Sequence, residues 1–116
     1  MPQPAIAKQQ VASAYEAFNA REAETGLSLL HPDVEWDDGE GHMLQSLAAV
    51  RRHWQQQWAA ADAKVELLAL LDAPDDDVSA HVRLITRSEG GRVARELRNE
   101  FHFSDGLIRC MRIRAL

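Results

Sequence analysis

The sequence predicts an α+β domain in which three N-terminal helices pack on a curved antiparallel sheet. Apolar residues recur at helical spacing up to Asp62, and beyond Asp62 they alternate with polar residues as they do in strands. The later segments are joined by turns of a few residues, which make neighbouring strands antiparallel. Helices on one face of such a sheet leave a cone-shaped apolar pocket between the two layers.

Composition limits the classes of protein to which the chain can belong. Its 116 residues are expected to form a single domain, residues 1–116. The formal net charge of −5 argues against nucleic-acid binding, although eight arginines follow residue 80. No apolar run approaches the roughly 20 residues that span a bilayer, and residues 1–10 lack the apolar centre of a signal peptide. With Cys110 as the only cysteine, we expect a cytoplasmic protein that does not bind membranes.

Two helices are expected at the start of the chain. Residues 5–20 form the first, because apolar side chains recur there at helical spacing, at Ala7, Val11, Ala14, Tyr15 and Phe18. A shorter helix at residues 23–30 is expected to stop before Pro32, because a residue that precedes proline is pushed out of helical geometry. Residues 34–37 then form a brief extended piece.

A third helix is expected after a polar loop that contains two glycines. Ser46 is suited to cap its N-terminus, since a serine hydroxyl accepts a hydrogen bond from a free backbone N–H of the first turn. The helix then covers residues 47–61. Its apolar stripe includes Trp54 and Trp58, which lie one turn apart and are expected to serve both as core and as cavity wall.

Four strands complete the prediction, at residues 65–71, 78–87, 93–103 and 107–115. They are separated by turns rich in proline, aspartate and glycine. The second strand places Val82 on the face that is expected to contact the helices. The third places on that face Arg95, Leu97, Asn99, Phe101 and Phe103.

Four segments carry a resemblance to a known family. They are YEAFNA at 15–20, LLHPDVEW at 29–36, AVRRHW at 49–54 and FSDGLI at 103–108. Their order and spacing resemble the SnoaL-like proteins of the nuclear transport factor 2-like superfamily. The resemblance covers nearly the whole chain and implies a cystatin-like α+β barrel. That superfamily holds isomerases, cyclases, hydrolases, dehydratases and proteins without known activity, so the fold leaves the function open.

The steroid isomerase branch of this superfamily offers the nearest catalytic comparison. Its enzymes resemble this chain in carrying an aspartate base after the second helix, where Asp38 stands. They place an oxyanion-binding tyrosine on the first helix, one position from Tyr15, and a protonated acid on the penultimate strand, where Asn99 stands. The resemblance also implies that no metal or organic cofactor is needed and that the protein forms a homodimer through the outer face of the sheet.

The residues themselves support a candidate base at the end of the extended piece. A carboxylate whose pKa is raised in an apolar pocket can take a proton from a carbon next to a carbonyl. Asp37 and Asp38 follow Trp36, which can supply part of the apolar wall. Strand alternation lets only one of the two face inward, and Asp38 is the expected one. The alternative is that both aspartates begin a solvated loop.

Asn99 and Tyr15 are the candidate groups for binding an oxygen atom. Asn99 shares a face with apolar residues, so its amide needs a partner, which can be a ligand carbonyl, Tyr15 or water. An amide donor in that position can stabilise an enolate-like oxygen. Tyr15 either points its hydroxyl into the cone or lies at the boundary with its hydroxyl in water, and we expect the boundary position.

The remaining charged candidates are weaker. The five histidines lack metal-ligand spacing, and only His42, in the glycine-containing loop, is a candidate general acid or base. Arg95 shares the face of Asn99, where it meets either an anionic group at the rim or solvent. His81 and His102 are expected on the outer face of the sheet.

Two functions from different classes follow. The first is an enzyme that binds a small, mostly apolar carbonyl compound and moves a proton, as an isomerase or cyclase does. The second is a non-catalytic ligand-binding or dimerisation module, which would have a shallow cone or no inward carboxylate. In both, the expected walls of the cone are Phe18, Trp36, Trp54, Trp58, Val82, Leu97, Phe101, Phe103 and Met111.

Overall fold

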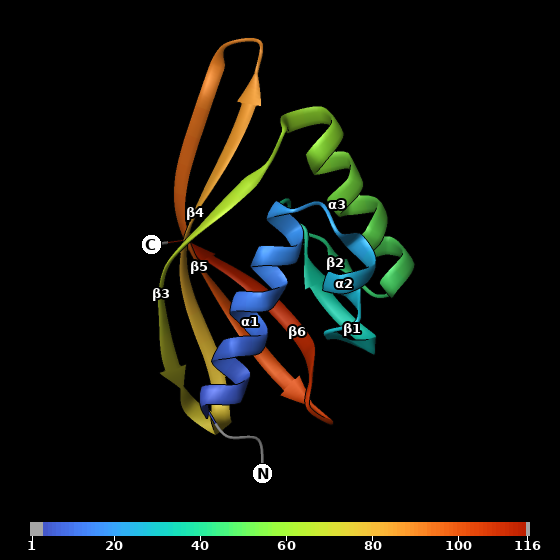
Figure 1. The fold of residues 1–116 in the computed structure, drawn as a ribbon, viewed down its shortest axis with the longest axis vertical. Helices are drawn as coiled ribbons and strands as arrows, with labels where there is room; N and C mark the ends of the chain where they lie inside the picture. The colour runs from blue at the N-terminus through green and yellow to red at the C-terminus, as the bar shows by residue number, and fades with distance from the viewer. Residues whose placement is uncertain (1–3, 116) are drawn as a thin grey trace.

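The computed structural model describes residues 4–115, which form three helices and a six-stranded sheet. The helices lie together on one side of the strongly bent sheet (Figure 1). They are α1 (Pro4–Asn19), α2 (Ala23–Leu27) and α3 (Leu47–Ala61). The strands are β1 (Leu30–Asp37), β2 (Met43–Leu44), β3 (Lys64–Ala73), β4 (Asp77–Ser88), β5 (Gly91–Ser104) and β6 (Leu107–Ala115). The α+β fold class is confirmed. No helix within residues 4–115 is long and apolar enough to cross a membrane.

The third helix and the last strand lie where the sequence predicts them. Ser46 caps α3, because its Oγ accepts a hydrogen bond of 3.1 Å from the N–H of Ala49. Asp62 ends the helix in the left-handed conformation, with φ of 46°. These boundaries depend on local capping chemistry, which is readable in the sequence.

The region around Pro32 differs from the prediction. The second helix ends at Leu27, and β1 already begins at Leu30 and runs for eight residues. This strand pairs in parallel with β6, whereas the neighbouring pairs in the rest of the sheet are antiparallel. Proline has no N–H to donate to a strand ladder, and Pro32 falls where the β1–β6 register is irregular, between Leu30 and Glu35.

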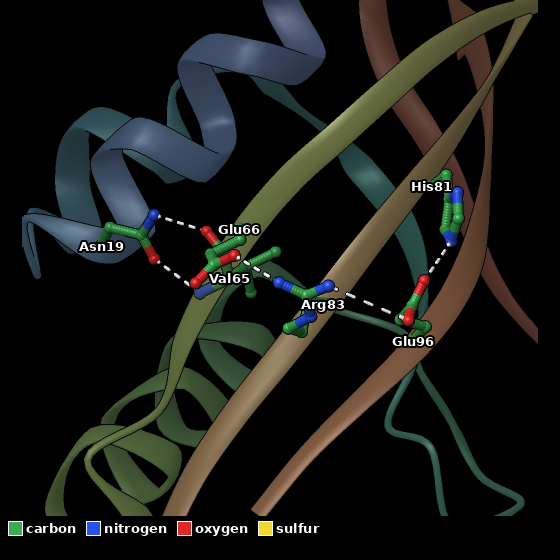
Figure 2. Close-up of polar contacts among 6 residues, drawn as sticks. All are labelled: Asn19, Val65, Glu66, His81, Arg83 and Glu96. Atoms are coloured by element: carbon green, nitrogen blue, oxygen red, sulfur yellow. Dashed lines mark hydrogen bonds and ion pairs between the residues drawn. The ribbon is translucent and has the colours of Figure 1, made fainter.

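The strand order is β2-β1-β6-β5-β4-β3, so the last strand of the chain lies inside the sheet and β3 lies at one edge. The end of α1 is fastened to that edge by the side chain of Asn19. Its Nδ2 donates to the carbonyl of Val65 at 2.7 Å, and its Oδ1 accepts from the N–H of Val65 at 2.8 Å (Figure 2). Both bonds satisfy backbone groups of β3 that the sheet leaves unpaired.

The outer face of the sheet carries charged side chains that pair with one another across three strands. Arg83 on β4 lies 3.0 Å from Glu66 on β3 and 3.9 Å from Glu96 on β5. His81 lies 3.0 Å from the other oxygen of Glu96 (Figure 2). The expected outer position of His81 is therefore observed. Because side chains alternate along a strand, the neighbouring Val82 lies on the inner face, where it is 1% exposed.

Candidate functional site

The inner face of the sheet and the helices enclose a cavity of about 330 Å³. This volume lies at the small end of the range for ligand pockets, roughly 300 to 1,000 Å³. The cavity is lined by side chains from α1, α3, β1, the loop after β1, and the strands β3 to β6. Among the predicted walls, those in the lining are Phe18, Trp36, Trp54, Val82, Leu97, Phe101 and Met111.

Two predicted wall residues do not line the cavity. Trp58 is buried one turn beyond Trp54 and packs on Phe18, with ring centroids 5.4 Å apart. Phe103 follows an irregularity in the β5–β6 register that falls between His102 and Phe103. The extra residue of this bulge is Arg109 of β6, so the alternation along β5 continues, and Phe103 is partly buried against the hydrophobic core beyond the cavity.

Close packing fixes the back wall of the cavity. Gly26 of α2 lies so near Trp54 that a Cβ built on it would stand 2.9 Å from the indole ring. Trp54 in turn meets Trp36 edge-on, with centroids 5.6 Å apart. A glycine at position 26 is therefore needed for this close approach and not for an unusual backbone angle.

Tyr15 and Asn99 form a buried polar pair in the lining of the cavity. The Nδ2 of Asn99 donates to the Tyr15 hydroxyl at 2.7 Å. Asn99 is 7% exposed and Tyr15 is 8% exposed. The expectation that the Tyr15 hydroxyl lies in water is wrong. Burial raises the pKa of Tyr15 well above its ordinary value despite the hydrogen bond from Asn99, so the phenol stays protonated.

This pair retains unused hydrogen-bonding capacity. The Tyr15 oxygen is the acceptor of its bond with Asn99, so its own O–H remains available as a donor. The Oδ1 of Asn99 is buried and has no hydrogen-bond partner among residues 4–115. A buried polar atom without a partner costs about 1–3 kcal/mol, and native proteins keep few of them. The pair thus offers one donor and one acceptor to a molecule in the cavity.

Asp38 also lines the cavity, but its carboxylate is bound to its own loop. Its Oδ1 accepts from the N–H of Glu40 at 2.7 Å and from the N–H of His42 at 3.1 Å. Its Oδ2 lies 3.4 Å from Nδ1 of His42. The hydrogen bond from the Glu40 backbone, helped by His42, lowers the pKa of Asp38 below its ordinary value. The raised pKa expected for a base in an apolar pocket is therefore not found.

Asp37 faces the same cavity, contrary to the expectation that only one of the two aspartates does so. Its Oδ2 accepts from the N–H of Ile113 on β6 at 3.0 Å, and its Oδ1 accepts from the N–H of Gly39 at 2.8 Å. Asp37 is the last residue of β1, so Asp38 already belongs to the loop, where the alternation of a strand no longer applies.

His53 is a lining residue that the sequence analysis missed. It stands on α3 next to Trp54, is half-buried, and has no hydrogen-bond partner for its ring within the described residues. Burial lowers the pKa of His53 below its ordinary value, an effect opposed by the charges of Asp38 and Glu40. The imidazole is therefore neutral near pH 7. His42, the histidine that the sequence favoured, is exposed in the loop and lies outside the lining.

The helical period predicts on which side of α3 His53 lies. It lies three residues after Val50 and four before Gln57, so it flanks the apolar stripe of α3. Its contact with the cavity depends on where the loop after β1 folds, which one sequence does not indicate.

Arg95 is the cationic side chain of the lining on the sheet. It is exposed at the rim, opposite Leu84 in the β4–β5 register, and makes no ion pair with another described residue. No group of three or more histidine, cysteine, aspartate or glutamate side chains within residues 4–115 is placed to hold a metal ion. The polar side chains of the lining are thus the Tyr15–Asn99 pair, Gln57, Thr86 and the ionisable groups of the mouth.

Comparison with known proteins places this geometry in context. The sequence profile of the SnoaL-like domain matches residues 11–111. No curated protein matches the chain. Many solved structures share its fold.

Three of these solved structures illustrate the range. The RV0760c protein of Mycobacterium tuberculosis, in complex with estradiol-17β-hemisuccinate, has a TM-score of 0.82 and 19% identity, over 93% of this chain and 92% of that one. The Δ5-3-ketosteroid isomerase of Mycobacterium sp. has a TM-score of 0.81 and 15% identity, over 96% and 93%. SalBIII, an epoxide hydrolase/cyclase-like enzyme with a role in pyran ring formation in salinomycin, has a TM-score of 0.81 and 18% identity, over 91% and 87%.

Proposed function

Because the chain belongs to the SnoaL-like domain family, we propose that it binds a small, mostly apolar molecule in its cavity and moves a proton on it without a cofactor, as isomerases and cyclases do. The observation that carries the proposal is the Tyr15–Asn99 pair, buried in an otherwise largely aromatic and aliphatic lining. An unpartnered amide oxygen and an unused phenol O–H at such a place call for a ligand with an oxygen function.

The pair suits a carbonyl group whose oxygen gains charge during the reaction. A proton removed from the carbon beside a carbonyl leaves an enolate, and a fixed donor stabilises that oxygen more strongly than it stabilises the carbonyl. The Tyr15 O–H is such a donor, and its raised pKa keeps the proton on the phenol. Two of the structures with this fold involve steroids, so steroids are the first compounds to test.

Binding is measurable by the fluorescence of Trp36 and Trp54, which line the cavity. Titration with a panel of ketosteroids and smaller aromatic ketones is expected to change this fluorescence saturably for at least one compound. Loss of one hydrogen bond, in Tyr15→Phe or Asn99→Leu, should weaken that affinity about tenfold, since about 1.4 kcal/mol corresponds to a factor of ten. Arg98→Ala, on the same strand but the opposite face, is the matched control and should bind as the unaltered protein does. A panel without any ligand would contradict the proposal.

Catalysis is measured separately from binding. For any ketone that binds, NMR in D2O reports whether the protein accelerates exchange of the hydrogens next to the carbonyl. Exchange above the buffer rate is the expected result. Asp38→Asn tests in the same assay whether Asp38 is the base that the sequence predicts.

A second candidate is a binding module of the same fold without catalysis. The observation that favours it is the engagement of the Asp38 carboxylate by the N–H groups of Glu40 and His42. A carboxylate so held is a weaker base than an unbound one. Saturable binding of ketones with no acceleration of exchange at any pH would establish this candidate and exclude the first.

A homodimer through the outer face of the sheet is part of the proposal. On that face Leu71 of β3, which pairs with Ser79 of β4, is 55% exposed. The family resemblance is the support for this dimer, and Leu71 is an exposed apolar residue of that face at which the contact is testable. Light scattering after size-exclusion chromatography measures the mass directly.

A further inference from the structure

The position of His53 between the cavity and its mouth deepens the function proposed above. His53 lines the 330 Å³ cavity and also a second hollow of about 420 Å³ that adjoins it. Other residues shared by the two hollows are Asp38, Glu40, Gln57 and Ala61. A group in this position reaches the bound molecule on one side and exchanges protons with solvent on the other.

The hydrogen-bond geometry separates His53 from the other candidate bases. The Oδ1 of Asp38 accepts two backbone N–H groups of its loop and its Oδ2 lies 3.4 Å from Nδ1 of His42, while the oxygens of Asp37 accept from the N–H groups of Ile113 and Gly39. The ring of His53 has no such partner among the described residues. A proton acceptor needs an available lone pair. The carboxylate of Glu40 also lines the cavity without a hydrogen bond from residues 4–115, but Glu40 is exposed at the mouth, whereas the imidazole of His53 is half-buried beside Trp54.

We propose that the imidazole of His53, and not the carboxylate of Asp38, accepts the proton from a ligand bound at the Tyr15–Asn99 pair. This assignment rests on the proposed function. Asp38 then acts as a positioning residue, which orders the loop after β1 through the N–H groups of Glu40 and His42 and supplies a negative charge beside His53. The ligand class is a mostly apolar ketone whose acidic C–H lies on the side of the carbonyl that faces α3.

The proposed step is balanced within the cavity. The lone pair of the neutral imidazole takes the proton, the C–H electrons form a carbon–carbon double bond, and the carbonyl electrons move to the oxygen held by the Tyr15 O–H. When the ligand is a β,γ-unsaturated ketone, as the Δ5-3-ketosteroid probe is, the enolate is a dienolate. The imidazolium then returns the proton to the γ carbon, the double bond moves to the α,β position, and the oxygen electrons re-form the carbonyl. The product is an isomer, and neither a metal nor a redox partner takes part.

The charges around His53 set its pH response. Asp38 and Glu40 face it from the loop after β1, Arg52 precedes it on α3, Asp37 lies at the end of β1, and Arg95 stands at the rim on β5. Desolvation outweighs the neighbouring carboxylates, so the pKa of His53 is lowered. Exchange is therefore expected to be constant above about pH 6.5, the ordinary value for histidine, and to fall with a midpoint below that pH. A carboxylate base with a lowered pKa keeps its rate down to about pH 4.

The test compares variants with a Δ5-3-ketosteroid as the probe. Hydrogen exchange is followed by NMR in D2O, and binding is followed by tryptophan fluorescence. His53→Gln should slow exchange about a hundredfold or more, with a change in Kd of less than about threefold. Asp38→Asn should retain exchange within about tenfold. His102→Gln, on the outer face, is the histidine control, and circular dichroism confirms that each variant is folded.

Chemical rescue distinguishes a base from a residue with a structural role, because an added base restores exchange only when the missing side chain took the proton. Imidazole added to His53→Ala should restore exchange in proportion to its concentration, because the substitution leaves space for the added base. Unchanged exchange in His53→Gln, loss of exchange confined to Asp38→Asn, or a rate that stays constant down to pH 4 would overturn the assignment of His53 alone. Failure of the unaltered protein to bind the probe or to exchange its hydrogens would overturn the proposed function and this assignment together.

Discussion

Tyr15 and Asn99 are joined by one buried hydrogen bond, in which each residue supplies the partner for a buried polar group of the other. Tyr15→Phe would leave both ends of the Asn99 amide without a partner, so the free energy of unfolding should fall by about 1–3 kcal/mol. Asn99→Leu leaves only the phenol unpaired. When both substitutions are made, no unpaired polar group remains, and the double variant should be more stable than the sum of the single effects predicts.

Urea unfolding of the four proteins measures this coupling as a double-mutant cycle. A coupling energy of about 1 kcal/mol or more is the expected result. Additive effects would show that the hydrogen bond at 2.7 Å contributes little to stability.

Asp38 provides a prediction about pH. Its pKa is lowered in the folded protein, so folding favours the charged carboxylate. The contribution of this carboxylate to the free energy of unfolding is therefore fully present above the unfolded pKa, about 3.9. That contribution is lost as the pH falls through the lower, folded pKa. Asp38→Ala should therefore destabilise the protein at pH 7, by about 1 kcal/mol for its backbone hydrogen bonds.

The measurement is the unfolding free energy of Asp38→Ala and of the unaltered protein between pH 7 and pH 3. The difference should be constant from pH 7 to about pH 5 and should shrink below about pH 4. A difference that grows on acidification would contradict the lowered pKa. Glu89→Ala, at the exposed β4–β5 turn, is the control for a lost surface carboxylate.

The chemistry of these residues was only partly predictable from sequence. Tyr15 and Asn99 were identified through the family resemblance, but they lie 84 positions apart. Their contact depends on how α1 packs on β5. Asp38 lies in the lining, while its pKa depends on loop N–H groups whose direction no residue type reveals. His53 has the same chemistry as the exposed His42, and only the packing of the loop distinguishes them.

At the scale of elements, the contact between α2 and α3 is set by Gly26. A methyl group at position 26 would lie 2.9 Å and 3.2 Å from two ring atoms of Trp54, which is itself 2% exposed and held by Trp36. The ring cannot move away without shifting the cavity wall. Gly26→Ala should therefore lower the unfolding free energy by about 1–3 kcal/mol, as overpacking of a core usually does.

The same substitution should reduce ligand affinity, because Trp54 would be pushed toward the cavity. Gly90→Ala is the matched control, since its nearest neighbour is the Ser88 hydroxyl at 3.8 Å and no backbone strain is involved. Thermal unfolding and the fluorescence titration measure the two effects. An unchanged melting temperature for Gly26→Ala would show that α2 can shift to accommodate the methyl group.

Elements with local signals were predictable and elements with remote partners were not. The cap of α3 and the tight turn before β6 are encoded within a few residues, and both boundaries agree with the structure. The pairing of β1 with β6 joins residues about 75 positions apart, such as Trp36 and Met111. Proline in the middle of β1 also hides the strand, because it is tolerated only where the ladder is already irregular.

At the scale of the whole molecule, the proposed dimer places its contact on the outer face of the sheet. Leu71 lies on that face by register, opposite Ser79, and a charge placed there would have to be buried in the proposed dimer contact. Leu71→Glu should therefore raise the dimer dissociation constant at least tenfold. Val93→Glu is the control, because Val93 is similarly exposed, at 52%, but lies near the β4–β5 turn on the other face.

Sedimentation velocity over a range of concentrations measures this equilibrium. An unaltered protein that is monomeric at every concentration would contradict the dimer. A dimer that Leu71→Glu does not weaken would place the contact on another surface.

The interior position of β6 has a consequence for how the protein is made. This strand lies between β1 and β5, so the early half of the sheet cannot attach to the late half until the ninth and last residue of β6 has been synthesised. On the ribosome, β1 must wait for β6, which is synthesised after the other five strands of this sheet. We therefore expect nascent chains stalled before residue 107 to remain sensitive to protease, and chains extended well past residue 115 by a linker to become resistant in one step.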